Sequence, residues 1–187
     1  VLDQRATIEF AAISRAFVIP AGITAVLLGP LWPQMTRMFA RGEAAGVRRL
    51  VRNACALGIL ALAVFTAVII VAKEPLFRYW LGRGHTPASS LIGLFAAAQA
   101  TIMAGTILAA ALKAIEELAW QLHAGIVMCL AGLLLKPYLC RAFGAPGVPL
   151  GFLLTYMPIS LLPSIVVFIR ITSPSRFKLR SHVQVSV

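Results

Sequence analysis

Five long runs of apolar residues, separated by short polar segments, make up most of the chain. A helix that rises about 1.5 Å per residue needs roughly 20 residues to cross the roughly 30 Å of hydrocarbon in a bilayer, and each run is near or above that length. The runs lack the alternation of a barrel strand, so only helices can satisfy their backbone polar groups inside lipid. The pattern therefore predicts an all-α integral membrane bundle, with helices at about residues 8–32, 54–72, 89–112, 118–136 and 147–169.

The connections between the runs are short and leave no room for a soluble domain, so residues 1–172 are predicted to form one bundle. The segment KEPLFRYWLGRGHTPASS carries the Trp and Tyr expected at a headgroup boundary, with Gly and Pro residues that break helices. Residues 173–187 are predicted to form a disordered cytoplasmic tail. Prolines inside the first and last runs predict kinks, because they remove ladder hydrogen bonds; they are Pro20, Pro30, Pro33, Pro158 and Pro163.

Composition supports the membrane class. Hydrophobic residues form 60% of the chain, charged residues only 12%, and the mean hydropathy is +0.90, values outside the usual range of soluble domains. The net charge of +11 could suggest a nucleic-acid partner. The basic residues instead flank apolar runs and form no stripe with interleaved aromatics, so we expect them to face membrane lipids and expect no nucleic-acid partner.

Basic residues gather around one short turn within LWPQMTRMFARGEAAGVRRLVRNA. Lys and Arg near helix ends stay on the cytoplasmic side of a membrane and set its topology. Assigning this turn to the cytoplasm places ten basic residues on that side and five on the other, with Arg5 and Arg15 left near the start of the first helix, which predicts an external N-terminus and a cytoplasmic C-terminus. The topology determinants are Arg37, Arg41, Arg48, Arg49 and Arg52, and the five basic residues on the other side are Lys73, Arg78, Arg83, Lys136 and Arg141.

This arginine block has a second interpretation. Besides topology and attraction to anionic lipid, Arg48 or Arg49 could act in a gate by pairing with an acidic residue of another bundle. The topology interpretation is favoured, since a basic residue near an anionic membrane surface contributes about 1 kcal/mol by itself.

The chain begins VLDQRATIEF, without an initiator Met, a basic n-region or a cleavage signal. An external N-terminus without a signal sequence is most simply explained if further membrane helices precede residue 1. We therefore expect the chain to be part of a longer protein.

The block PLWPQMTRMFARGEAAGVRRLVRNA, followed by an apolar helix and then EPLFRYWLG, resembles the polysaccharide flippases of the multidrug/oligosaccharidyl-lipid/polysaccharide exporter superfamily. FGAPGVPLGFLLTYMPISLLP is similar to the opening of that family's last core helix. The residues that carry the resemblance are Pro30, Trp32, Pro33, Gly42, Glu43, Arg48, Arg49, Pro75, Trp80, Leu81, Gly82, Gly144, Gly147 and Gly151.

The resemblance implies a fold and a function. Family members have two bundles of six helices or more, and the five runs here look like the eighth to twelfth helices. The family's exporters flip O-antigen and exopolysaccharide precursors, as undecaprenyl-pyrophosphate oligosaccharides, across the bacterial inner membrane by alternating access. The implied partners are this lipid-linked substrate and membrane lipids, with polysaccharide polymerase machinery left open; no covalent catalysis and no cofactor is implied.

A sugar-pyrophosphate headgroup needs positive charge and hydrogen bonds along its path. An ionisable residue at membrane depth costs at least ~2.5–3.5 kcal/mol and is a functional candidate by default. Arg15 fits this description and shares one broad side of the first helix with Arg5 and Glu9, which could face a water-filled cavity. The alternative is that all three lie in the headgroup layer, with the arginine snorkelling towards it.

Three further residues have both a functional and a structural interpretation. Gln99, in the middle of its helix, could donate hydrogen bonds to sugar hydroxyls or simply bond a neighbouring helix. Tyr156 could stack on a sugar ring or pack in the core. His123 could relay a proton for coupling, or be structural, as a lone His near a helix end more often is.

Other chemistry is not indicated. Cys55, Cys129 and Cys140 lack the spacing of a metal or disulfide motif, and the three histidines are scattered, so no metal site is predicted. Gly147 and Gly151 form a GxxxG pattern, which favours close helix packing.

Three alternative functions stay open. A multidrug exporter of the same superfamily would favour acidic groups in its cavity, and the second to fifth runs contain no central Asp or Glu. A membrane enzyme of polysaccharide assembly would need a large external loop, which the short connections do not provide. A non-transporting scaffold or truncated relic is the third.

Overall fold

The computed structural model describes residues 4–82, 86–114 and 119–173, and within these ranges every regular element is a helix. Five of the helical spans are long and apolar enough to cross a membrane, so the predicted all-α membrane fold is confirmed. The elements are α1 Gln4–Ala16, α2 Val18–Ala40, α3 Ala44–Val71, α4 Lys73–Leu81, α5 Ser89–Lys113, α6 Ala119–Phe143, α7 Gly147–Tyr156, the π-helical η1 Met157–Leu161 and α8 Leu162–Ile171.

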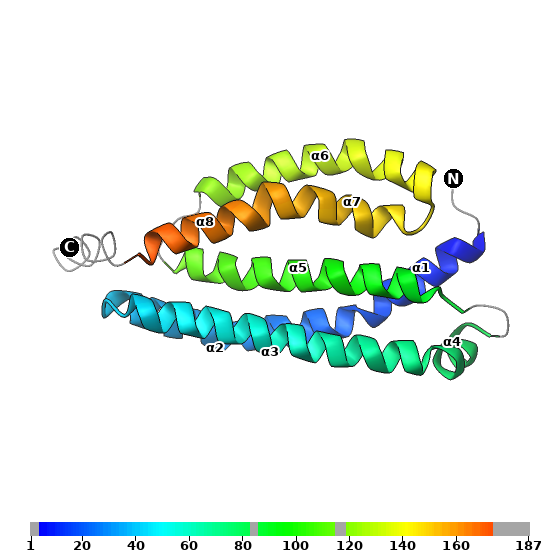
Figure 1. The fold of residues 1–187 in the computed structure, drawn as a ribbon, viewed down its shortest axis with the longest axis horizontal. Helices are drawn as coiled ribbons and strands as arrows, with labels where there is room; N and C mark the ends of the chain where they lie inside the picture. The colour runs from blue at the N-terminus through cyan, green and yellow to red at the C-terminus, as the bar shows by residue number, and fades with distance from the viewer. Residues whose placement is uncertain (1–3, 83–85, 115–118, 174–187) are drawn as a thin grey trace.

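The long helices run side by side, with α5 in the middle of the bundle (Figure 1). Helices α2 and α3 pack along one side of α5, while α7 and α8 pack along the other and carry α6 on their outer side. The α2/α3 turn and the ends of α5 and α8 lie together at one end of the bundle, which we call the arginine end. The α6/α7 turn and α4 lie at the opposite end.

The turn at the arginine end is built around a glycine. Gly42 follows α2 with a φ of 75°, and the Glu43 N–H donates to the Met38 carbonyl oxygen at 2.9 Å. The Gly42 N–H donates to the Phe39 carbonyl at 3.1 Å, which completes the hydrogen-bond pattern of a Schellman motif. This closure reverses the chain within a few residues and brings the arginines of α2 and α3 to one end.

The first predicted helix, 8–32, continues into the arginine block, as its pattern predicts, and is interrupted once. α1 and α2 together form a span from Ala6 to Ala40, with a break at Phe17. Pro20 lies three residues after the break and has no N–H for the preceding turn, which accounts for the interruption. Pro30 and Pro33, in contrast, lie within a continuous α2.

Two further predicted boundaries are corrected. The helix expected at 54–72 begins at Ala44, so Arg48, Arg49 and Arg52 are helical. The helix expected at 118–136 continues to Phe143, because Pro137 removes one hydrogen bond without ending the helix and Gly144, at a φ of 67°, ends it instead. Lys136 is predicted to be the last residue of this helix, at its external end, and instead lies seven residues before the end of a membrane-spanning helix.

The other differences are smaller. The helix expected at 89–112 ends one residue later, and the one expected at 147–169 reaches Ile171 through the π-helical turn, which contains Pro158. KEPLFRYWL, expected as a connection, forms α4, and its Lys73 ammonium donates to the Ser89 hydroxyl at 2.8 Å. Arg83 and most of the predicted tail lie outside the described residues.

The core consists of two clusters placed along the bundle. One is in the half nearer the arginine end, where α2, α3, α5, η1 and α8 meet around Met35, Val47 and Leu112. The other is in the opposite half, where α1, α3, α4 and α5 meet around Ile13, Phe77 and Ile92. α6 belongs to neither cluster and is the least buried of the five spans.

Glycines hold α7 tightly on α6. A Cβ on Gly147 would collide with the Leu139 carbonyl and come within 2.7 Å of the Cys140 nitrogen. At Gly151 the nearest atom to such a Cβ is the Lys136 Cγ, at 3.0 Å. The predicted role of this GxxxG pattern in close packing agrees with the structure, and the packing brings α7 against the stem of Lys136.

Candidate functional site

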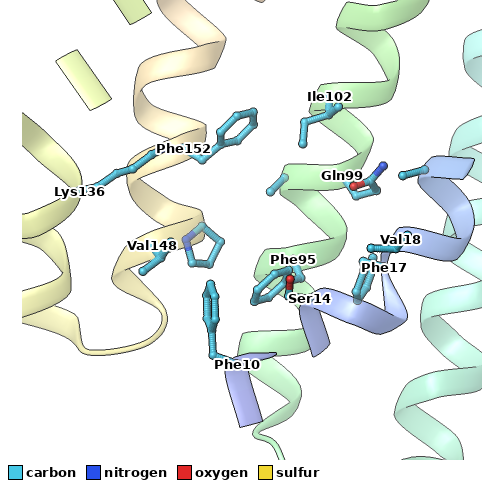
Figure 2. A pocket seen from close by; sticks show the side chains of 13 residues that line it. Phe10, Ser14, Phe17, Val18, Phe95, Gln99, Ile102, Lys136, Val148 and Phe152 are labelled. Carbon is cyan, nitrogen blue, oxygen red and sulfur yellow. The ribbon is translucent and has the colours of Figure 1, made fainter. Parts of the chain in front are cut away.

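A cavity of about 270 Å³ lies where α1 and α2, α5, α6 and α7 come together, and we call it the central cavity (Figure 2). Its wall is mostly apolar, and four phenylalanines contribute to it, from α1, the α1/α2 break, α5 and α7. Its described lining has the polar side chains of Ser14, Gln99 and Lys136 and no acidic one. The lining residues are Phe10, Ser14, Phe17, Val18, Ala21, Phe95, Ala98, Gln99, Ile102, Lys136, Val148, Pro149 and Phe152.

Lys136 is the charged residue of this wall. It is seven residues from the end of α6, so its backbone lies about 10 Å inside the helix. The side chain is half-buried and lies back along α6, with its ammonium 3.8 Å from the position that a Cβ on Gly132 would take. Because this direction leads away from the nearer helix end, the ammonium does not snorkel to that surface.

The aromatic ring of Phe152 lies beside the Lys136 ammonium. The Lys136 Nζ is 5.8 Å from the centre of the Phe152 ring, and Figure 2 shows the lysine extending from α6 towards that ring on α7. A cation near an aromatic face is stabilised by about 0.5–2 kcal/mol, depending on desolvation. Placing an ammonium at membrane depth costs ~2.5–3.5 kcal/mol, so the ring offsets only part of that cost. An anion in the cavity would offset more.

The Tyr156 ring packs against the Phe152 ring. The two rings stack with centroids 5.0 Å apart and an interplanar angle of 19°. The Tyr156 hydroxyl lies directly against Gly105 of α5, and the phenol shares a hydrogen bond with the Ser160 side chain. Tyr156 is therefore a packing residue between α5 and η1 that fixes the position of a cavity wall, and it does not itself line the cavity.

Gln99 is the predicted polar candidate that the structure brings to the cavity. It lies ten residues into α5, about 15 Å from that helix's start, and is half-buried. In Figure 2 its amide lies between α5 and α2, on the opposite side of the cavity from Lys136. The cavity thus presents a cation on one wall and an uncharged donor and acceptor on the other.

The other predicted candidates lie elsewhere. Arg15 is exposed and does not line the cavity, Glu9 is half-buried on α1 outside the lining, and the side chain of Arg5 lies outside the described residues. His123 is exposed on α6 near the arginine end. The five topology arginines are all exposed around the α2/α3 turn, and these are Arg37, Arg41, Arg48, Arg49 and Arg52.

Sequence reasoning missed Lys136, although a signal was present. The residues after it, PYLCRAF, continue an apolar helical pattern for two turns before a glycine stop signal. Placing the helix end at the first charge concealed a cation at membrane depth. Comparison of the chain with models of protein families, with curated proteins and with solved structures finds no match. We therefore infer function from the cavity's own residues together with the sequence resemblance.

Proposed function

We propose that the chain belongs to a bacterial inner-membrane transporter that flips undecaprenyl-pyrophosphate oligosaccharides, precursors of surface polysaccharide, by alternating access. The observation that carries this proposal is Lys136, a cation in a cavity between membrane-spanning helices whose described lining contains no acidic side chain. The resemblance of the chain to polysaccharide flippases supports the same function.

The cavity suits the headgroup of such a substrate. A pyrophosphate is a strong anion, and an ammonium is a compact partner for its oxygens. Gln99 and Ser14 offer donors and acceptors for hydroxyl groups, while the aromatic rings offer faces against which a sugar ring can pack. The substrate's hydrocarbon tail needs no polar contact and can stay in lipid while the headgroup crosses.

The charge distribution supports an orientation. Seven described basic residues lie at the arginine end, including Lys113 and Arg170, whereas six lie in the opposite half of the bundle: Arg5 and Arg15 on α1, Lys73, Arg78, Lys136 and Arg141. By the positive-inside rule the arginine end is cytoplasmic, and headgroups enter from that side. Lys136 then lies in the external half of the bundle, as a step on the outward path.

A multidrug exporter is less well supported. A cavity that binds cationic drugs needs negative charge, and the cation on the wall of the central cavity would repel them. The short described connections also offer no catalytic domain, so we propose transport without covalent chemistry.

The test is a flipping assay in lipid vesicles with the purified transporter to which the chain belongs. A fluorescent undecaprenyl-pyrophosphate sugar is placed in both leaflets, and a membrane-impermeant reductant bleaches the outer leaflet. Vesicles containing the protein are expected to bleach the inner-leaflet population as well, whereas empty vesicles retain it. If vesicles with and without the protein behave alike, the proposed function is wrong.

Substitutions then test the site. Lys136→Gln is expected to slow flipping at least tenfold, because removing a charge-assisted contact costs about 1.5–3 kcal/mol, while Lys136→Arg keeps the charge and retains most activity. The matched control is Arg141→Gln, which removes a positive charge from the exposed end of the same helix. Equal flipping by the Lys136→Gln and Arg141→Gln variants would show that the central cavity is not the headgroup site.

A further inference from the structure

A second cavity, of about 380 Å³, lies between α2 and α5 nearer the arginine end, and we call it the arginine-end cavity. Its wall is lined by Leu28, Gly29, Trp32, Thr106, Ala109, Ala110 and Lys113. Small residues on both helices leave this space open, and a Cβ on Gly29 would meet no atom within 4 Å. The transport site proposed above does not use these residues.

The two cavities share one side of α5. The α5 residues Phe95, Gln99 and Ile102 line the central cavity, and Thr106, Ala110 and Lys113 line the arginine-end cavity. Consecutive members of this series are three or four residues apart, which places all of them on one face of the helix. The arginine-end cavity therefore lies further along the same line towards the cytoplasmic surface, with Lys113 about 21 Å along α5 from Gln99, and we also call this cavity the furrow.

The chemistry of the two cavities differs. In the arginine-end cavity the Thr106 hydroxyl already donates to the Ile102 carbonyl of its own helix at 2.7 Å, which leaves Lys113 as the charged group of the described lining. The remaining wall is hydrocarbon and the Trp32 indole. Lys113 is in the last turn of α5, at the same end as the exposed arginines of α2 and α3. An occupant of this cavity would be held by a hydrocarbon surface at one side and by positive charge at its polar end.

We propose that the arginine-end cavity binds an anionic phospholipid of the surrounding bilayer, with one acyl chain in the furrow and its phosphate at Lys113. Charge complementarity favours an anionic headgroup, because Lys113 and the nearby arginines together concentrate positive potential where the furrow reaches the surface. The apolar wall accepts a chain, and the one hydroxyl proton of its described lining, that of Thr106, is already donated within α5. A phospholipid needs only these two features, an apolar wall for its acyl chain and a positive charge for its phosphate.

Trp32 provides the probe for this site. Trp80→Phe and Trp120→Phe leave Trp32 as the single tryptophan, and bromine atoms on lipid chains quench a tryptophan that they contact. The protein is placed in zwitterionic vesicles that contain increasing fractions of a brominated lipid, either anionic or zwitterionic. Brominated anionic phospholipid is expected to reach half-maximal quenching at about one fifth of the fraction that brominated zwitterionic lipid needs, the factor that one lysine near a membrane surface contributes.

Matched variants separate a bound lipid from the lipid that merely surrounds the bundle. Lys113→Gln is expected to abolish the anionic preference, while Arg170→Gln, which removes a charge from the same end without touching the cavity, retains it. Gly29→Leu fills the furrow and is expected to remove the high-affinity phase of quenching. Gly125→Leu adds the same bulk at an open glycine of α6 and leaves that phase intact.

Three results would overturn the proposal. Equal quenching by the two brominated lipids in the parent protein would mean that Trp32 contacts only bulk lipid. If the Lys113→Gln variant kept the parent's preference for anionic lipid, the lipid phosphate would not be bound at Lys113. Displacement of the brominated phospholipid by a polyprenyl phosphate at a lower fraction would assign the furrow to the substrate's chain instead. None of these measurements depends on flipping activity. The lipid-binding proposal can therefore be refuted or supported independently of the proposed transport function.

Discussion

Gly147 is the position where a single methyl group should matter most to the bundle. A Cβ there would meet the carbonyl of Leu139 and, at 2.7 Å, the nitrogen of Cys140. These are backbone atoms of α6, so no change of side-chain rotamer can relieve the collision. Gly147→Ala must instead push the first turn of α7 away from α6, and we expect the Leu139 end of their interface to open.

The size of the effect follows from two opposing contributions. Forcing an extra methyl into a packed interface typically costs about 1–3 kcal/mol. Replacing Gly by Ala within a helix gains up to about 1 kcal/mol, although this gain is smaller at the first residue of α7. We therefore expect Gly147→Ala to lower the free energy of unfolding by about 1–2 kcal/mol.

Two other glycines provide the controls. At Gly151 a new Cβ would meet the flexible stem of Lys136 at 3.0 Å, so Gly151→Ala should be close to neutral. At Gly125 it would meet no atom within 4 Å, so Gly125→Ala should stabilise the protein by up to about 1 kcal/mol. The order of stability, Gly125→Ala above Gly151→Ala above Gly147→Ala, depends only on what each methyl touches.

The assay is reversible unfolding of the purified protein in mixed micelles by increasing SDS, monitored by tryptophan fluorescence. Each variant is compared with the parent at the same micelle composition. If Gly147→Ala were as stable as Gly125→Ala, α7 would not need a glycine at its start, and close backbone packing would not be what joins it to α6.

Three further predictions concern other parts of the bundle. Gly105→Ala should destabilise the protein by about 1–3 kcal/mol in the same SDS titration, because its methyl would occupy the place of the rigid Tyr156 phenol; an unchanged midpoint would contradict that contact. Phe152→Leu keeps an apolar wall but removes the ring beside the Lys136 ammonium. The loss of about 0.5–2 kcal/mol of cation–π stabilisation should slow flipping several-fold. A flipping rate equal to the parent's would show that the ring only fills space. Replacing Arg48 and Arg49 together by Gln should increase the fraction of molecules that insert with inverted orientation. This fraction is measured by labelling a cysteine placed in the α2/α3 turn with a membrane-impermeant reagent. An unchanged fraction would mean that other charges set the orientation.

Local patterns were enough to predict the five membrane-spanning helices and their order. Length and hydropathy identify a membrane span directly, because lipid forces its backbone into a helix whatever its neighbours are. The GxxxG pattern at Gly147 and the basic turn at Gly42 were also local signals, and the structure places each of them where tight packing or a chain reversal occurs.

The central cavity could not be predicted in the same way. It forms where residues from α1, α2, α5, α6 and α7 meet, and no local pattern states which faces of these five helices point together. Arg15 and Gln99 looked equally polar in the sequence, yet one is exposed and the other lines the cavity. Lys136 was misplaced because hydropathy alone does not distinguish a charge that ends a helix from one that a neighbouring helix accommodates.

The joining of α6 to α7 has a consequence for how the protein is made. α6 leaves the ribosome before α7, and Lys136 reaches the membrane while Gly151 and Phe152 are still inside the ribosomal exit tunnel. Those partners lie about 15 residues further along, a delay of roughly one to three seconds at usual elongation rates of about 5–20 residues per second. During that interval α6 alone bears the ~2.5–3.5 kcal/mol cost of a lysine in lipid. We therefore expect α6 to remain beside the translocon until α7 emerges, so that the two helices enter the bilayer together as a hairpin.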